Sequence, residues 1–131
     1  MKNIYLVINV ILVNFLLTLN LMANQPNNFD IGVKYFKKND LKKSKISFEK
    51  DIVFNPSNEK SYLYLAKIFK KTNKIDEEEI NLNSVLLLNP KNDEAIYLLT
   101  LLKINQYDFD KANELIDDFK SVCKSFCNKK N

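Results

Sequence analysis

The chain has 131 residues, 46% of them hydrophobic, which suits one folded domain. Its formal net charge is +4, but its 20 basic residues are interleaved with 16 acidic ones, so no nucleic-acid surface is indicated. Histidine is absent and Gly32 is the one glycine, which excludes Ser-His-Asp triads, HExxH metal sites and glycine-rich phosphate loops. So few glycines and prolines favour an all-α fold over a sheet with many tight turns.

The first expected element is an apolar segment at the amino terminus. Lys2 precedes an uncharged, largely apolar stretch from Ile4 to Ala23, and the chain turns polar at Asn24. This is the layout of a secretory signal, so we expect residues 1–23 to direct export, with Ala23 at the cleavage site. A stretch of this length also suffices to span a bilayer, so an uncleaved signal anchor is the alternative.

Three asparagines, Asn9, Asn14 and Asn20, interrupt this stretch. Buried amides need hydrogen-bonding partners in lipid, which favours cleavage over a permanent membrane helix. In either case the positive-inside rule keeps Lys2 in the cytoplasm. The remainder of the chain is therefore expected in a periplasm or at the outer face of the membrane.

A regular interval organises the rest of the chain. Pro56 and Pro90 each follow an asparagine and a mostly apolar run, and they lie 34 residues apart. Because proline cannot continue a helix, each marks the end of one. The expected domain spans residues 24–126, with repeats at about 25–58, 59–92 and 93–126 and a short basic tail at 127–131.

Each unit is expected to contain two helices. They span residues 27–38 and 41–54, 59–71 and 75–88, and 93–105 and 109–126. The last of them carries its apolar residues on one face, so it can end the array with its other face in water. The run INLNSVLLL at 80–88 is apolar on more of its circumference, as expected for a helix covered on two sides.

Aligned on the prolines, the units share residue types at equivalent positions. They are Ile31, Gly32, Tyr35, Ser44, Phe48 and Pro56, then Tyr62, Leu65, Ala66, Phe69, Glu78, Leu82, Val85 and Pro90, then Ile96, Leu99, Ala112, Ile116 and Phe119. This pattern resembles the tetratricopeptide repeat (TPR) family over residues 25 to about 126. The resemblance implies a solenoid of three helical hairpins. Ser44, Asp51 and Glu78 depart from it, since small alanines are usual there.

The resemblance also implies a binding groove, because the first helices of TPR units line a concave surface. The positions that face it correspond here to Phe29, Val33, Phe36, Leu63, Lys67, Lys70, Tyr97, Leu101 and Ile104. An apolar floor with a central lysine pair suits an extended or helical peptide with apolar anchors and an acidic group. Alternatively Phe29, Phe36 and Ile104 are partly core and the lysines are simply solvated.

One TPR subfamily grips the carboxylate of chaperone tails with a clamp of lysine, asparagine and arginine. The corresponding places here include Tyr64, Glu94 and Leu98, so such a clamp is not expected. The four acids Asp76 to Glu79 open an expected helix, where they favour the helix dipole and point in different directions around the axis. We therefore expect no metal, cofactor or catalytic site there.

Cys123 and Cys127 lie four residues apart near the end of the last expected helix. That spacing separates the Cβ atoms beyond disulfide geometry unless the helix frays, so packing of Cys123 in the core is favoured over a disulfide. Without further ligands the pair is not a zinc motif.

The sequence thus predicts an exported, non-enzymatic TPR module or scaffold that holds a peptide segment of a protein partner, without cofactor or nucleic acid. One alternative is a self-associating spacer whose groove closes on another copy of the chain. Another is a membrane-anchored assembly scaffold. An enzyme is a weaker alternative that depends on the acidic run at 76–79.

Overall fold

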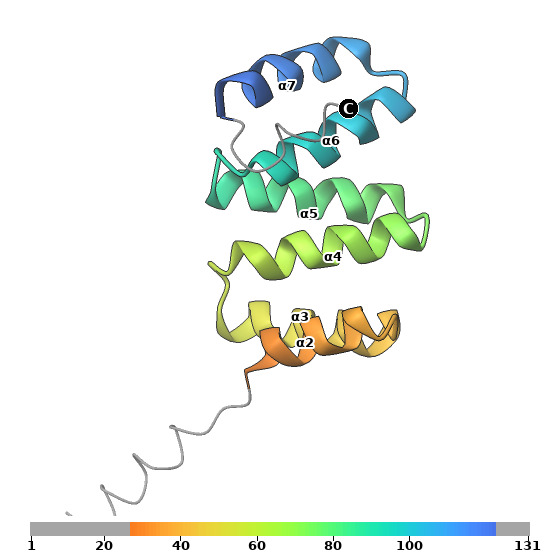
Figure 1. Ribbon diagram of the computed structural model, residues 1–131, viewed down its shortest axis with the longest axis vertical. Coiled ribbons are helices and arrows are strands. Elements are labelled where there is room, and N and C mark those ends of the chain that lie inside the picture. The colour runs from red at the N-terminus through yellow and green to blue at the C-terminus, as the bar shows by residue number, and fades with distance from the viewer. Residues whose placement is uncertain (1–26, 123–131) are drawn as a thin grey trace, which may run out of the picture.

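The computed structural model describes residues 27–122, and this part of the chain is helical apart from its turns. The helices are α2 (Asn28–Lys37), α3 (Leu41–Phe54), α4 (Glu59–Lys71), α5 (Ile75–Leu88), α6 (Asp93–Asn105) and α7 (Phe109–Val122). Figure 1 shows them as three hairpins stacked in chain order along the long axis. The expected helix bounds are confirmed to within one residue as far as 122.

Several expectations fall on residues that the structure does not describe. They concern the signal or anchor at 1–23, the basic tail at 127–131, and Cys123 and Cys127. Within residues 27–122, no helix is long and apolar enough to cross a membrane.

Each hairpin turns through one residue in the left-handed region of backbone space. These residues are Asn39, Asn73 and Tyr107, with φ of 58°, 54° and 61°, at the same position of each unit. The next residue donates its backbone N–H to a carbonyl five positions earlier, as Asp40 does to Tyr35 at 3.0 Å. This closing bond satisfies the last turn of the first helix, so the hairpins bend where the sequence predicts.

The hairpins are separated at the two prolines. Helix α3 ends at Phe54, just before Asn55 and Pro56, and α5 ends at Leu88, before the second Asn-Pro pair. The prediction that proline ends the second helix of each of the first two units is confirmed. The Asn92 side chain then accepts a hydrogen bond from the backbone N–H of Ala95 at 3.0 Å, which caps α6.

Within residues 27–122, the core consists of two clusters. The first is aromatic: the Phe48 side chain is fully buried and stacks on Tyr64, with ring centroids 4.9 Å apart. The second is aliphatic and joins the second and third hairpins through Leu63, Ala66, Leu82, Val85, Ala95, Ile96, Leu99, Leu102 and Leu115. Because each cluster is shared between neighbouring hairpins, a single hairpin could not bury its apolar face alone.

The second helices carry an unexpected amount of exposed apolar surface. Helix α5 is covered on two sides, by α4 and α6, as expected. Its outer side is nevertheless apolar and open, since Ile80 is 63% and Leu87 is 84% exposed. The equivalent residues of α3, Ile46 and Val53, are exposed as well. The side of α7 that faces solvent is polar, with Glu114 and Ser121 at the corresponding positions.

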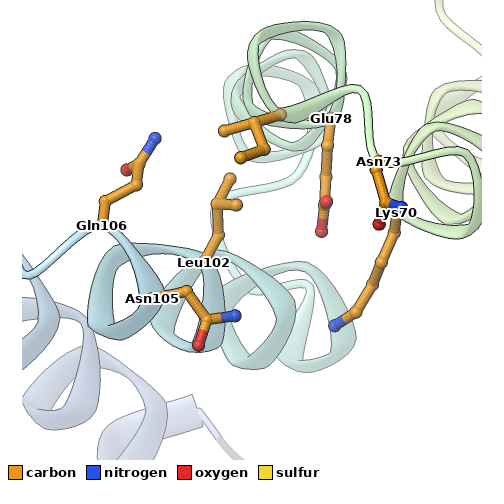
Figure 2. A pocket seen from close by; sticks show the side chains of 7 residues that line it. Lys70, Asn73, Glu78, Leu102, Asn105 and Gln106 are labelled. Carbon is orange, nitrogen blue, oxygen red and sulfur yellow. The ribbon is translucent and has the colours of Figure 1, made fainter.

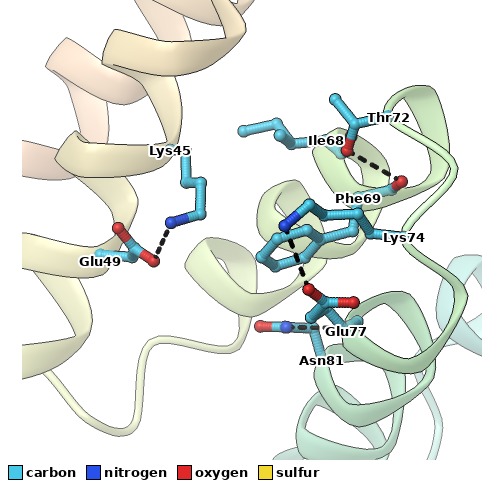
Figure 3. Close-up of polar contacts among 8 residues, drawn as sticks. All are labelled: Lys45, Glu49, Ile68, Phe69, Thr72, Lys74, Glu77 and Asn81. Atoms are coloured by element: carbon cyan, nitrogen blue, oxygen red, sulfur yellow. Dashed lines mark hydrogen bonds and ion pairs between the residues drawn. The ribbon is translucent and has the colours of Figure 1, made fainter.

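Charged side chains lie along the edge between α3 and the second hairpin. Lys45 of α3 pairs with Glu49 and lies over the Phe69 ring of α4, with Nζ 5.9 Å from the ring centroid (Figure 3). Beside it, Lys74 donates to Glu77 at 3.2 Å across the first turn of α5. These contacts are exposed or partly exposed, so each contributes little to stability.

Candidate functional site

The first helices of the hairpins are neighbours, and we call the side that carries the nine predicted groove residues the first-helix face. Tyr64 of α4 joins α4 to α2, because its ring lies 5.1 Å from that of Phe36 in an edge-on contact. Lys67 joins α4 to α6 through an ion pair with Glu94 at 2.8 Å. The structure therefore brings the three predicted rows of residues onto adjacent helices.

The first row, on α2, belongs partly to the core. Phe29, Val33 and Phe36 are half-buried and pack against the aromatic cluster around Phe48. The ring of Phe29 lies 5.8 Å from the rings of both Phe48 and Tyr64. At this end of the first-helix face, side chains of the protein itself occupy much of the apolar surface, as the alternative interpretation of Phe29 and Phe36 anticipated.

The second row, on α4, is the most varied. Leu63 is 8% exposed and belongs to the aliphatic core. Lys67 is tied to Glu94, and its Nζ lies over the Tyr64 ring at 5.1 Å from the centroid. Lys70 is exposed. The two lysines therefore do not form the equivalent pair that the sequence suggested, because one of them already has a carboxylate partner.

The third row, on α6, is more open. Tyr97 is half-buried, with its ring 6.1 Å from that of Phe119 on α7. Leu101 is half-buried too, and Ile104 is 40% exposed. Ile104 is thus the most accessible apolar side chain among the predicted groove residues.

Two hollows border both α4 and α6, and residues of α5 or of its connections complete their walls. The amino-end hollow, of about 380 Å³, lies where α6 begins and is lined by Glu59, Lys60, Leu63, Tyr64, Lys67, Asn89, Lys91, Asn92, Asp93 and Glu94. The carboxyl-end hollow, of about 260 Å³, lies where α6 ends and is lined by Lys70, Asn73, Ile75, Glu78, Leu102, Asn105 and Gln106. Three predicted groove residues, Leu63, Lys67 and Lys70, line these hollows.

The carboxyl-end hollow contains a buried acid. Glu78 extends from α5 toward α6, between Leu102 and Lys70 (Figure 2). It is 5% exposed, and burial raises the pKa of its carboxyl group, an effect that the positive charge of Lys70 opposes. A carboxyl group in this position accepts a proton or a cation more readily than one in water.

The pKa of Glu79, the next acid along the helix, is shifted in the opposite direction. Glu79 accepts a hydrogen bond from Lys103 Nζ at 2.6 Å and another from Gln106 Nε2 at 3.1 Å. The bond from Lys103 lowers the pKa of Glu79 against the effect of burial. The acids at 76–79 therefore diverge, and within residues 27–122 no group of three or more Cys, His or acidic side chains could hold a metal ion.

Sequence reasoning missed two residues that shape the site. Glu94 was considered only as a residue that breaks the chaperone clamp, whereas it neutralises Lys67. Glu78 departs from the small residue of the repeat pattern, but it was interpreted, with its neighbours, only as a residue that stabilises the helix dipole. A large charged residue at a helix-crossing position was the available signal for the carboxyl-end hollow.

The fold is that of TPR domains in solved structures. The first TPR domain of Spaghetti (RPAP3), bound to the HSP90 peptide SRMEEVD, has 17% identity and a TM-score of 0.67 over 73% of this chain and 78% of its own. The TPR2B domain of yeast Sti1, in a complex with pHsp70, has 19% identity and the same TM-score of 0.67 over 76% of this chain and 80% of its own. The solenoid predicted from the repeat interval is thus confirmed.

The MamA protein is also similar, with 20% identity and a TM-score of 0.67 over 73% of this chain. The present chain covers about half of MamA, 52% of its length. No known family profile matches the chain. No curated protein sequence matches it either. Likeness at these identities establishes the fold, and the function has to be argued from the site.

Proposed function

We propose that this chain is an interaction module that binds a peptide segment of a partner protein along the first-helix face, between α4 and α6. The observation that carries the proposal is the pair of hollows at the two ends of these helices, since a peptide lying along the face could place a side chain in each. Two proteins of the same fold are seen with peptide or protein ligands, an HSP90 peptide and pHsp70.

The chemistry of the face suits a peptide of mixed character. Ile104 and the half-buried Leu101 offer apolar contacts, while the Lys67–Glu94 pair joins α4 to the amino end of α6. An acidic ligand group would have to compete with Glu94 for Lys67, which weakens the case for a purely acidic partner. Binding and orientation need no catalytic group, so we infer a non-enzymatic role.

We further propose that the module acts outside the cytoplasm. This part of the proposal rests on the sequence of residues 1–23, with a charged start and an apolar stretch, and those residues lie outside the described structure. Whether the segment is cleaved or retained decides between a free periplasmic adaptor and a membrane-anchored scaffold.

Self-association is a second candidate because of the exposed apolar residues on α3 and α5. Ile46 and Ile80 occupy equivalent positions, as do Val53 and Leu87, and all four are between 46% and 84% exposed. Exposed apolar surface that repeats in this way is a common feature of protein interfaces. A spacer of this kind would associate through its second helices, and its first-helix face would be left open.

The test is peptide selection on the full-length protein, kept soluble in a neutral maltoside detergent. Displayed random peptides would be selected, and the affinity of an enriched peptide would be measured by fluorescence anisotropy. We expect Ile104→Ser and Lys67→Ala to weaken binding about tenfold, or about 1.4 kcal/mol each. The matched control is Leu87→Ser, an apolar-to-polar change on α5, which should leave the affinity unchanged.

Two outcomes would overturn the proposal. One is an affinity that falls with Leu87→Ser and not with Ile104→Ser, which would place the ligand on the second helices. The other is the failure to enrich any peptide together with a mass that doubles with concentration. That second result, if abolished by Leu87→Ser, would establish the self-associating spacer instead.

A further inference from the structure

The carboxyl-end hollow exists because two residues of the second unit differ from their counterparts in the first. In the first unit, Phe36 occupies the position of Lys70 and packs against the aromatic core, with Lys71 Nζ 5.2 Å from its ring centroid. Ser44 occupies the position of Glu78, and its Oγ donates to the carbonyl of Gly32 at 2.9 Å. That junction is filled and its polar atoms are satisfied.

The second unit leaves the same place open. Lys70 is exposed where Phe36 is packed, and Glu78 directs a carboxylate into the space where Ser44 bonds to the backbone. Among the residues that the structure describes, the side chains of Glu78 and Lys70 have no ion pair or hydrogen bond, with each other or with any other residue. Figure 2 shows the Lys70 ammonium beside α6 at one margin of the hollow.

The other polar groups of the hollow are side-chain amides, each of which has an oxygen that can accept a hydrogen bond as well as N–H donors. Gln106 uses its Nε2 to donate to Glu79, which leaves its carbonyl oxygen for a ligand. Asn73 and Asn105 add amide oxygens from opposite sides. The nearby charges of Glu79 and Lys103 are paired with each other at 2.6 Å, so they do not neutralise Glu78.

We propose that the carboxyl-end hollow receives a cationic side chain, a lysine or arginine of the bound peptide, whose charged group pairs with Glu78. This inference rests on the proposed function, since it names the residue type that the peptide would supply there. Glu78 is only 5% exposed, so its charge is poorly hydrated, and a ligand cation that fills the hollow offsets that cost while amide oxygens accept its remaining hydrogens. The positive charge of Lys70 acts on Glu78, so the proposal requires this exposed ammonium to stay in solvent when the ligand is bound.

The first experiment uses a small probe, so that it does not depend on finding a peptide. n-Butylammonium chloride, which mimics a lysine side chain, would be titrated into ¹⁵N-labelled full-length protein in neutral maltoside detergent at constant ionic strength. We expect saturable amide shifts confined to Asn73, Glu78, Asn105 and Gln106. Butyramide, uncharged and of similar shape, should produce shifts at least about tenfold weaker at equal concentration.

Three variants make the assignment specific. Glu78→Gln should weaken butylammonium binding about tenfold or more, because it removes the buried charge and keeps the shape. Lys70→Phe, which copies the first unit, should abolish binding by filling the hollow. Glu77→Gln removes the same charge one residue away, from an acid that faces Lys74, and should leave binding unchanged. Equal binding by wild type and Glu78→Gln, or non-saturating shifts spread over the surface, would overturn the proposal.

Peptide selection then separates this inference from the proposed function. If both hold, enriched peptides carry a lysine or arginine whose replacement costs as much affinity as Glu78→Gln does. If peptides without basic residues are enriched and bind Glu78→Gln as tightly as wild type, the inference fails and the proposed function stands. If butylammonium binds at Glu78 but no peptide is enriched, the cation site stands and the proposed function fails.

Discussion

Phe48 fills the space in front of the Cα atom of Gly32: a Cβ atom on that glycine would lie 2.6 Å from Cε1 of the ring. The ring cannot easily withdraw, since it is fully buried and stacked on Tyr64. In the second unit the equivalent residues are Ala66 and Leu82, both buried. The larger Phe48 thus faces the smaller Gly32 in the first unit, and the smaller Leu82 faces the larger Ala66 in the second.

We predict that Gly32→Ala destabilises the protein by about 1–3 kcal/mol through overpacking, although alanine favours a helix by about 1 kcal/mol over glycine. Adding Phe48→Leu copies the second unit and should recover part of that loss. Urea unfolding followed by circular dichroism measures both. A stabilising effect of Gly32→Ala alone would show that the backbone relaxes and that the contact with Phe48 does not matter.

The junction between the first and second hairpins is held by a buried acid. Asp51 is 2% exposed, and its carboxyl group accepts hydrogen bonds from Ser61 Oγ and Asn58 Nδ2, each at 2.6 Å. At the next junction the residues equivalent to Asp51 and Ser61 are Val85 and Ala95, both fully buried. The chain therefore uses a polar and an apolar solution for the same packing problem.

We predict that Ser61→Ala costs about 1.5–3 kcal/mol, because it removes a short hydrogen bond from a buried charged acceptor. The double variant Asp51→Val, Ser61→Ala copies the apolar junction and should be less destabilised than Ser61→Ala alone, since the buried acid is then gone. The unfolding free energies of Ser61→Ala, Asp51→Val and the double variant, together with that of wild type, form a double-mutant cycle. Additive effects would contradict the coupling.

How far the sequence predicts this structure depends on how far apart in the chain the interacting residues lie. The 34-residue interval and the Asn-Pro pairs predicted the hairpins and the helix bounds, because turns and helix ends are determined by nearby residues. Contacts between residues of different helices decide which side chains of the first-helix face are already engaged within the protein. The contact of Phe36 with Tyr64 and the ion pair of Lys67 with Glu94 leave no periodic trace in the sequence.

Glu78 shows where sequence and structure disagree most usefully. Its membership of an acidic run suggested a solvated helix start, and that holds for the exposed Asp76. Its place in the repeat, opposite a small residue of the first helix, instead forces it into the interior. Position within the repeat was the stronger constraint, because the crossing of two packed helices holds most of that side chain out of solvent, at the margin of the carboxyl-end hollow.

Tyr107 offers a test of local backbone strain. It adopts a φ of 61°, while the equivalent turns place Asn39 and Asn73 in the same region. A bulky residue is disfavoured there by about 1–2 kcal/mol, and Tyr107 is 80% exposed, so little packing compensates. We predict that Tyr107→Asn raises the melting temperature and that the reverse change, Asn73→Tyr, lowers it. A lower melting temperature for Tyr107→Asn would mean that the edge-on contact of the Tyr107 and Phe109 rings, with centroids 6.2 Å apart, outweighs the strain.

Glu78 and Glu79 should give opposite pH dependences of stability. Burial raises the pKa of Glu78 above its ordinary value of 4.5, so the folded protein binds its proton more tightly than the unfolded chain does. The favourable contribution of Glu78 to the free energy of unfolding is therefore present below pH 4.5 and is lost as the pH rises through the raised pKa. The pKa of Glu79 is lowered by Lys103, so its contribution is present above pH 4.5 and is lost as the pH falls through the lowered pKa.

We predict that Glu78→Gln is more stable than wild type at pH 7, and that this difference shrinks toward zero near pH 4, where wild-type Glu78 is mostly protonated. Glu79→Gln should be less stable than wild type at pH 7, with a deficit that also shrinks in acid. Thermal melts of wild type and both variants between pH 3 and pH 8 provide the comparison. If Glu78→Gln is instead the less stable protein at pH 7, then Lys70 closes on Glu78 in solution, and a cationic ligand would have to displace it.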